Sequence, residues 1–394
     1  MSINIHRLPQ IYQTPTLGDQ EIKVLAKVDG LKEKLRSLLH EPRRWNGSLR
    51  RVAMAHVILG SSSIEGFNAP LDDGVAVAMG EEPLDPDHET RLALKGYRDA
   101  MTYVLQLATD DGFAYNDGLL KSLHFMMTNY DLKNRPGLWR TGQVFVRNDQ
   151  TQEIVYEGAD IDDVPHLIRE LIQWLGEPSD SPPMIRAAMA HLNLVMIHPF
   201  RDGNGRMARC LQSLVLARQG TLLPVFGSIE EYLGQNTQAY YDMLAAVGAG
   251  HWQPDRDATP WLRFILTAHL RQARTMLRRV KETEHLWADL EVIAKTRGLP
   301  ERMLSALYDA AYGFRVRRAT YQASDPDVLS DQTATRDLRQ LVLEGLLVPQ
   351  GERRGRHYLG SKTLRAVRRA IIDRRDPKDD SDPFALAPMP RRSA

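Results

Sequence analysis

The segment His198-Pro-Phe-Arg-Asp-Gly-Asn-Gly-Arg-Met-Ala-Arg209 decides the fold and the chemistry that we expect of this chain of 394 residues. It follows a stretch, 183–197, that is apolar on most helical faces and is therefore predicted to be a buried helix. A glycine-rich loop comes next and opens a second predicted helix over 205–218. Backbone N–H groups at the start of such a helix can point together at one anion.

The side chains of this segment suit a polyphosphate. Arg206 and Arg209 are three residues apart, which places them on one face of the second helix, where they could reach phosphate oxygens. Asp202 could hold a Mg²⁺ that also binds phosphates. His198 could accept a proton. The sequence therefore predicts a polyphosphate site with its own base.

The same residues also have simpler interpretations. Gly203-Asn-Gly-Arg-Met-Ala208 also fits a dinucleotide-binding pattern, but that pattern requires a preceding strand, and here a buried helix leads in. Neither G-x-x-x-x-G-K-[ST] nor H-E-x-x-H occurs in the chain. Taken singly, His198 would be a helix-terminal histidine and the two arginines a solvated face. Taken together, these residues favour the phosphate site.

The same segment resembles the Fic-family motif H-P-F-x-[DE]-G-N-G-R-x-x-R at every defined position. Two other stretches are also similar to this family. Arg135-Pro-Gly-Leu-Trp-Arg140, with the hairpin after it, resembles the flap that aligns a target segment by backbone pairing. Tyr240-Tyr241 resembles the pair of tyrosines near the nucleotide base. The resemblance covers roughly residues 20–250.

The resemblance implies a protein adenylyltransferase that moves AMP from the co-substrate ATP to a Ser, Thr or Tyr hydroxyl of a target protein, or of the chain itself. His198 would deprotonate the hydroxyl, and Asp202 would bind Mg²⁺ across the α- and β-phosphates. The residues implied to bind ATP are Gly203, Asn204, Gly205, Arg206, Arg209, Tyr240 and Tyr241. Those implied to dock the target are Gly137, Val144, Phe145 and Val146. Kinase relatives depart from the motif at its glycine, where this chain has Gly205, which favours AMP transfer.

A built-in inhibitory element is expected in Ser61-Ser-Ser-Ile-Glu65-Gly66. By residue type alone this is a helix end with serines and a solvated glutamate. It also resembles the family's inhibitory motif [ST]-x-x-x-E-[GN], located here in an N-terminal extension. The resemblance implies that Glu65 pairs with Arg209 and blocks the γ-phosphate position, for which carboxylate–arginine geometry is suited. Removal of AMP from a modified protein, with Glu65 orienting a water, is an alternative use of the same carboxylate.

The fold class is expected to be mainly α, with a Fic-type helical core, a β-hairpin flap and a C-terminal winged helix-turn-helix. The hairpin strands are predicted at 143–147 and 153–156, around Asn148-Asp-Gln-Thr. Helices are expected at 20–60 (two, broken near 41–44), 74–81, 89–109, 116–128, 162–176, 229–245 and 258–280. The expected domains are an N-terminal helical domain 1–110, a catalytic core 111–280, a winged-helix domain 281–375 and a disordered tail 376–394.

The expected C-terminal module has a helix at 299–311, a helix Asp331–Glu344 that Ser330 caps and Gly345 stops, and two wing strands around 351–355. Its arginines could contact nucleic-acid phosphates; they are Arg315, Arg317, Arg318, Arg336, Arg339, Arg353, Arg354 and Arg356. Acidic residues interleave with them, so the charge balance favours a protein-docking or dimer-forming module over DNA. A nucleotide-sensing DNA-binding regulator is the alternative function, against which the intact His198 argues.

Composition further limits the classes of binding partner that we expect. Lys and Arg number 51 and Asp and Glu 50, so net charge indicates neither nucleic acid nor a membrane. Cys210, the single cysteine, excludes an internal disulfide. No apolar run approaches the ~20 residues of a membrane span, and no signal-peptide pattern opens the chain. We expect a cytoplasmic protein, although an effector exported by a non-cleaved signal would look the same. Exposed helical faces around the core make a homodimer a further expectation.

Overall fold

The computed structural model describes residues 10–147, 153–220, 224–324, 329–352 and 355–385. Within these ranges the fold is mainly α-helical, as predicted, and its strands form two separate two-stranded antiparallel sheets, β1–β2 and β3–β4. No helix of the described ranges combines the length and the apolar character that crossing a membrane requires.

The larger part of the chain forms a body of helices with one small hairpin. Its elements are α1 (Asp19–His40), α2 (Asn46–Ile64), α3 (Leu71–Ala78), α4 (His88–Leu107), α5 (Asp117–Thr128), η1 (Leu132–Asn134), β1 (Phe145–Arg147), β2 (Ile154–Glu157), α6 (Val164–Gly176), α7 (Pro183–Ile197), α8 (Asn204–Arg218), α9 (Pro224–Gly227), α10 (Glu230–Gln235), α11 (Thr237–Gly248) and α12 (Thr259–Thr296).

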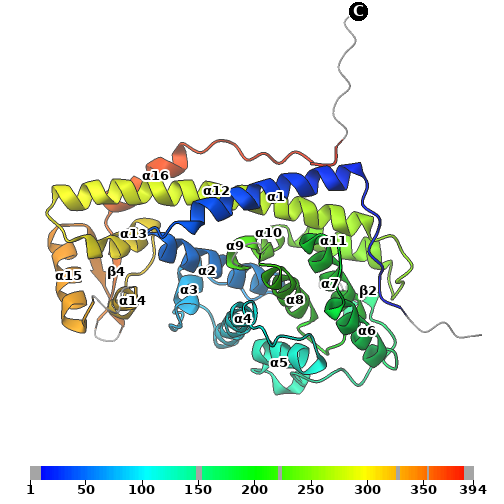
Figure 1. Ribbon diagram of the computed structural model, residues 1–394. Coiled ribbons are helices and arrows are strands. Elements are labelled where there is room, and N and C mark those ends of the chain that lie inside the picture. The colour runs from blue at the N-terminus through cyan, green and yellow to red at the C-terminus, as the bar shows by residue number, and fades with distance from the viewer. Residues whose placement is uncertain (1–9, 148–152, 221–223, 325–328, 353–354, 386–394) are drawn as a thin grey trace, which may run out of the picture.

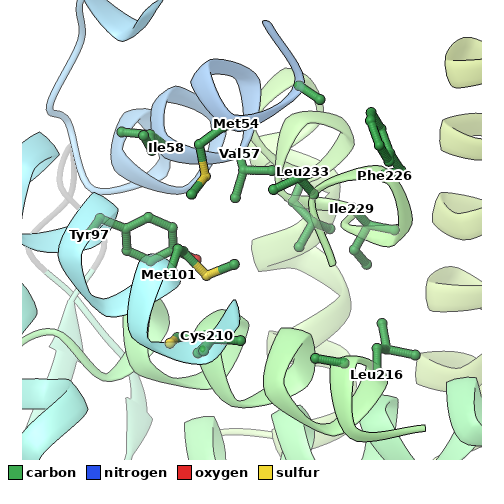
Figure 2. Close-up of a cluster of buried hydrophobic side chains, with 14 of the residues drawn as sticks. Met54, Val57, Ile58, Tyr97, Met101, Cys210, Leu216, Phe226, Ile229 and Leu233 are labelled. Carbon is green, nitrogen blue, oxygen red and sulfur yellow. The ribbon is translucent and has the colours of Figure 1, made fainter. Parts of the chain in front are cut away.

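The pair α7 and α8, joined by the loop that carries the motif, is the centre of this body. Both helices are surrounded, so α7 is buried at every position from Met184 to Ile197, and most of α8 is buried as well. Figure 2 shows how α2, α4 and the α9–α10 segment close over α8 with apolar side chains such as Met54, Met101 and Leu233. Burial of one such side chain stabilises the fold by ~1.5–3 kcal/mol. The helix that carries the expected inhibitory motif is therefore part of the core.

The crossing of α2 and α10 depends on two glycines. A Cβ at Gly60 would lie 2.4 Å from the carbonyl oxygen of Glu230, and one at Gly234 would lie 2.7 Å from that of Gly60. Contacts this short exclude any side chain, so the two backbones touch at this point. The close approach fixes the last turn of α2 relative to the body.

Several element bounds differ from the predictions. α3 begins at Leu71 instead of 74, because Pro70 takes the N-cap position and Asp72 lies in the first turn. The helix expected over 229–245 is broken at Asn236 into α10 and α11. α12 continues to Thr296, because its buried stripe extends through Leu290 and packs on the C-terminal elements. The expected domain boundary at 280–281 therefore lies inside one helix, which runs across the molecule beside α1 in Figure 1, below α16 (Lys362–Asp373).

The C-terminal elements include the two predicted helices and the predicted hairpin, with a further helix between those two helices and another after the hairpin. They are η2 (Glu301–Met303), α13 (Leu304–Tyr312), α14 (Arg318–Ala323), α15 (Asp331–Leu343), β3 (Leu347–Gln350), β4 (His357–Gly360) and α16 (Lys362–Asp373). The side chain of Ser330 caps α15 by accepting the N–H of Thr333, and Gly345 follows the helix in a left-handed conformation. Arg353 and Arg354 lie outside the described residues. A winged-helix role stays a prediction.

Arg315 and Arg317 do not face solvent as the nucleic-acid hypothesis requires. Arg315 contacts the carboxylates of Asp72, Asp73 and Asp85, and Arg317 donates to Glu81 at 3.1 Å. These acidic residues come from α3 and the loop after it, more than 200 positions earlier in the chain. The expectation that these two arginines contact phosphates is wrong, because they are neutralised by carboxylates of the same chain.

The structure describes the tail as far as 385, and this part of the tail contacts α12. Arg375 forms two hydrogen bonds of 2.6 Å with Glu282, and Asp379 lies 2.7 Å from Arg274. Beyond them, Phe384 lies beneath the guanidinium of Arg263. Arginines along α12 thus bind a segment that its composition alone marks as disordered. Residues 386–394 lie outside the described part of the chain.

Candidate active site

His198 ends α7 in a left-handed backbone conformation, with φ 54° and ψ 58°. A non-glycine residue reaches this region at a cost of about 1–3 kcal/mol, so surrounding contacts must hold it there. The buried Arg140 does so twice. Its Nε donates to the carbonyl oxygen of His198 at 2.8 Å, and its backbone N–H donates to that of Pro199 at 2.9 Å. The chain therefore leaves the helix at the residue that carries the imidazole.

The imidazole of His198 is oriented as a proton acceptor. Its Nδ1 lies 3.1 Å from the carbonyl oxygen of Val195, which can only accept, so Nδ1 carries the hydrogen and Nε2 keeps its lone pair. Burial, aided by the charge of Arg140, lowers the pKa of His198 below its ordinary value. The ring is therefore neutral near pH 7, which is the state that a general base requires.

The side chain of Asn204 fixes the loop between α7 and α8. Its oxygen accepts the N–H of Phe200 and its nitrogen donates to the carbonyl of Phe200, each at 2.9 Å. Gly203 has φ 75°, and a Cβ there would lie 2.8 Å from Thr128, so only glycine fits. Because the side chain of Asn204 is committed to the loop, any contribution of this residue to phosphate binding is limited to its backbone N–H.

Arg206 is buried below the loop. Its Nη1 donates to the hydroxyl of Tyr130 at 2.8 Å, and its Nη2 lies 3.4 Å from a carboxylate oxygen of Asp202. The ring of Phe67 lies 5.4 Å from the guanidinium. Among the described residues, Nε of Arg206 has no hydrogen-bond partner. A buried cation with an unpaired N–H gains from the approach of an anion.

Arg209 contacts the expected inhibitory motif. Its Nη2 donates to Glu65 Oε1 at 2.7 Å and to the carbonyl of Ser61 at 3.0 Å, while its Nε donates to Ser61 Oγ at 2.9 Å. Within the described ranges its Nη1 lacks a partner, and this nitrogen lies 3.0 Å from where a Cβ of Gly205 would be. The Glu65 carboxylate is 2.5 Å from the same point. The predicted pairing of Glu65 with Arg209 is therefore present, at the N-terminal end of α8.

The end of α2 places Glu65 at this position. Gly66 follows with φ 86° and donates to the carbonyl of Ser63, and Phe67 donates to that of Ser62, both at 3.1 Å. These two bonds form the Schellman motif, in which a left-handed glycine reverses the chain. Glu65 is thus the last residue before the reversal, and a rigid turn holds it over α8.

Glu65 is ionised in this environment. Burial alone would raise its pKa, but the charges of Arg209 and Arg206 outweigh burial and hold the pKa of Glu65 below its ordinary value. The N-terminus of α8 adds partial positive charge. A carboxylate therefore occupies the anion-binding position that the sequence predicted for phosphate.

Tyr240 and Tyr241 have different surroundings. Tyr240 is buried, its hydroxyl lies 2.9 Å from Nε2 of His191, and burial raises its pKa to about 12. Its expected role near the nucleotide base therefore has no support from exposure. Tyr241 is 40% exposed and donates its hydroxyl to the carbonyl of Ile64 at 3.0 Å. The structure thus ties Tyr241 to the end of α2, one residue before Glu65.

The predicted flap lies beside His198. Its strand β1 pairs with β2, with Phe145 opposite Glu157 and Val146 opposite Tyr156. Just before β1, the carbonyl of Val144 accepts the N–H of Gly158 at 3.1 Å. A Cβ on Gly158 would lie 3.1 Å from Cβ of His198, so the hairpin and the proposed base are adjacent. Phe145 is 41% exposed, as a residue that meets a target would be. The turn 148–152 lies outside the described residues.

His124 contributes to the site although the sequence prediction did not include it. Its Nε2 donates to the carbonyl of Asp202 at 2.8 Å, and its Nδ1 accepts the N–H of Gly137 at 2.9 Å. Its ring stacks on Phe200 at 3.6 Å. Burial lowers the pKa of His124 to about 4, so the ring is neutral. A polar residue one position after Leu123, within the apolar face of α5, was the available signal.

Asp202 offers a 47% exposed carboxylate at the edge of the site. No group of three or more His, Cys, Asp or Glu side chains in the described ranges could hold a metal without help. A Mg²⁺ bound with ATP needs no such group, since magnesium keeps several waters and takes one or two carboxylates plus phosphates. The carboxylate of Asp202 fits that kind of site.

Comparisons with known proteins agree with this geometry. A family model described as Fic/DOC matches residues 116–216, which include the flap, His198 and both arginines. The chain is 34% identical over 103 residues to protein adenylyltransferase fic-1 of Caenorhabditis elegans, covering 25% of this chain and 17% of that protein. It is 26% identical over 272 residues to protein adenylyltransferase Fic of Nematostella vectensis, covering 66% of this chain and 55% of the relative.

Solved structures show the same fold. A Fic family protein from Desulfovibrio desulfuricans G20 matches with a TM-score of 0.57 at 22% identity, over 89% of this chain and 99% of that one. Fic-1 from C. elegans matches with a TM-score of 0.52 at 23% identity, over 66% of this chain and 73% of that one. The chain spans 17% to 55% of the length of the curated relatives above, so their activities are not transferred as a whole.

Proposed function

The chain contains a Fic domain, and from that premise we propose that it is a protein adenylyltransferase, which transfers AMP from ATP to a Ser, Thr or Tyr hydroxyl of a target protein. The activity of the two relatives named above is the first support. The second is a site in which a base, an anion-binding helix start and two buried arginines lie together.

One observation carries the proposal. An ionised carboxylate, that of Glu65, already lies at the N-terminus of α8, 2.7 Å from Arg209. Two arginine nitrogen atoms of α8, Nε of Arg206 and Nη1 of Arg209, are buried and lack partners among the described residues. Unpaired buried donors are costly unless a ligand completes them. A triphosphate brings the oxygens that these donors require.

The positions of the side chains support the following reaction. Nε2 of His198 takes the proton of the target hydroxyl, whose oxygen then forms a bond to the α-phosphorus of ATP. The bond from that phosphorus to the oxygen bridging to the β-phosphate breaks, and pyrophosphate leaves. The N–H groups at the start of α8 stabilise the charge that develops, and Arg206 and Arg209 hold the leaving phosphates.

Mg²⁺ belongs to the same proposal, with Asp202 as its protein ligand. Bound with ATP, Mg²⁺ neutralises phosphate charge. Because Arg206 lies 3.4 Å from the Asp202 carboxylate, the arginine also orients this carboxylate before ATP arrives. The cytoplasm, where ATP and Mg²⁺ are both supplied, is the location we propose.

Inhibition by Glu65 is the regulatory part of the proposal. A γ-phosphate and the Glu65 carboxylate would compete for Arg209, because one guanidinium edge cannot serve both. ATP could still bind, but with its triphosphate displaced from in-line geometry. The anchoring of α2 in the core implies that relief acts on its last turn instead of removing the whole helix.

The test uses ATP labelled at the α-phosphate, with Mg²⁺, and Glu65→Gly protein. Label should enter Glu65→Gly protein, with little in wild type and none in a Glu65→Gly/His198→Ala double variant. ATP labelled at the γ-phosphate should leave no label. Incorporation of label from the γ-position would indicate phosphoryl transfer instead of AMP transfer. Absence of label from both positions would reject the proposal.

Removal of AMP from a modified protein remains the alternative, because ionised Glu65 could accept a proton from a water in the same site. Wild-type protein that strips AMP from the labelled Glu65→Gly product would favour it. The DNA-binding regulator has less support, since Arg315 and Arg317 are neutralised internally. A homodimer stays a prediction.

A further inference from the structure

His124 lies between the flap and the loop that joins α7 to α8. Through Nδ1 it accepts the N–H of Gly137, the left-handed glycine at the base of the flap. Through Nε2 it donates to the carbonyl of Asp202, the proposed magnesium ligand. One neutral imidazole thus joins two segments that are 65 positions apart.

The tautomer of this ring is fixed by its partners. An N–H can only donate and a carbonyl can only accept, so Nδ1 is bare and Nε2 carries the hydrogen. A half turn of the ring would replace both nitrogens by carbons and lose both hydrogen bonds.

Aromatic stacking makes the connection stiff. The His124 ring lies parallel to that of Phe200, with the ring centroids 3.6 Å apart. Trp139, two residues past Gly137, also packs against Phe200, with the ring centroids 4.7 Å apart. Phe200 is itself bracketed by Asn204 in the motif loop. The flap base and the loop are therefore joined by one hydrogen-bonded ring and by a row of three rings.

We propose that His124 is a positioning residue that couples the flap to the loop carrying Asp202, so that docking of a target segment and binding of Mg·ATP are linked. The proposal rests on the function proposed above and adds a route between the target side and the nucleotide side of the site. His124 touches neither the hydroxyl nor the phosphates, so its effect is exerted through Gly137 and Asp202 alone.

Two substitutions separate its two bonds. Asparagine carries its amide oxygen at about the distance of Nδ1 from the backbone, so His124→Asn can keep the acceptor for Gly137 while losing the donor to Asp202. Glutamine carries its amide nitrogen at about the distance of Nε2, so His124→Gln can keep the donor and lose the acceptor. His88→Gln, at an exposed position of α4, is the matched control.

Two measurements in the Glu65→Gly protein follow the Asp202 side and the flap side separately, and neither requires catalytic turnover. One is the Mg²⁺ concentration that half-saturates ATP binding, measured by calorimetry. The other is amide hydrogen exchange in the flap segment 137–147, measured by mass spectrometry. His124→Asn should raise the Mg²⁺ requirement roughly 10-fold, the usual effect of removing a support of a metal ligand, with flap exchange near the parent. His124→Gln should speed flap exchange about fivefold, as one lost hydrogen bond predicts, with the Mg²⁺ requirement near the parent.

Coupling of the two sides is tested by measuring flap exchange with and without saturating Mg·ATP. Binding of Mg·ATP should slow flap exchange in the Glu65→Gly protein, and this slowing should be lost in both His124 variants but kept in His88→Gln. Slowing that persists in both His124 variants, or no slowing in the Glu65→Gly protein, would overturn the coupling. Failure of the proposed function is a separate outcome: Glu65→Gly protein that shows the coupled slowing but never incorporates AMP would keep the coupling and reject the adenylyltransferase.

Discussion

Two of the places where arginines meet carboxylates differ in how completely the arginine is neutralised. At the contact between α3 and the C-terminal elements, Arg315 meets three carboxylates, those of Asp72, Asp73 and Asp85. At the start of α8, Arg209 pairs with Glu65, and its Nη1 has no partner within the described ranges. The saturated Arg315 fastens two parts of the fold, whereas Arg209, at the start of a helix and with a buried donor to spare, suits the proposed binding of a phosphate.

The comparison also separates what each carboxylate does. In the proposed function, Glu65 competes with a phosphate for Arg209, which it contacts at 2.7 Å. Glu81, which accepts from Arg317 at 3.1 Å, competes with nothing and only holds the C-terminal elements against α3. Substitutions at the two places should therefore change different properties, activity at the first and stability at the second.

The largest effect is expected at His198. In the Glu65→Gly protein, His198→Ala removes the proton acceptor and should lower the rate of AMP incorporation about 100- to 10,000-fold, the range of general-base contributions. The measurement is the initial rate with ATP labelled at the α-phosphate. ATP affinity should be nearly unchanged, and a comparable loss of ATP binding would show that the ring serves binding instead of chemistry.

The next effect concerns stability at the saturated arginine. Arg315→Ala leaves Asp73, which is fully buried, without its cation, and breaking a buried pair of this kind costs about 3 kcal/mol. The urea midpoint should fall accordingly. Arg318→Ala is the matched control, since its pair with Asp331 is exposed on both sides and should contribute less than about 1 kcal/mol. Equal shifts for the two variants would contradict the docking role of Arg315.

A smaller effect should follow from loosening the last turn of α2. Tyr241→Phe removes the hydroxyl that donates to the carbonyl of Ile64, next to Glu65. Loss of one hydrogen bond should raise the low labelling rate of the otherwise wild-type chain by up to about fivefold. The same change in Glu65→Gly protein should give no increase, because no carboxylate is left to release. An increase in both backgrounds would assign Tyr241 to nucleotide binding.

The smallest expected change is with pH. Only neutral His198 can take a proton, and its pKa is lowered from 6.5, so more than half of the molecules remain active at pH 6.5. The kcat/KM of Glu65→Gly protein should therefore be level from pH 8 to about 7 and keep over half its value at pH 6.5. An acid limb centred above pH 7 would exclude His198 in this environment as the base.

The parts of the site that lie close together in the sequence could be predicted. His198, Gly203 and Arg209 fall within twelve residues, so their spacing along the helix and the loop could be predicted without a structure. The burial of Tyr240 against His191 could not be predicted, because two adjacent tyrosines on a helix do not reveal which ring faces the core.

Contacts between distant segments explain the remaining differences. The roles of His124 and Arg140 depend on carbonyl groups of residues 58 to 78 positions away, to which no local pattern points. Arg315 looked like a ligand for phosphate because its carboxylates lie in a different part of the chain. The continuation of α12 past 280 likewise depends on the elements that pack on its second half.

The most direct test compares the same substitution at the two carboxylates. Glu65→Gly and Glu81→Gly proteins are incubated with Mg²⁺ and ATP labelled at the α-phosphate, and their initial labelling rates are compared with wild type. We expect Glu65→Gly to exceed wild type by well over an order of magnitude, about 1.4 kcal/mol per factor of ten, while Glu81→Gly stays at the wild-type rate. Equal rates for all three proteins would contradict the claim that Glu65 holds the phosphate site closed.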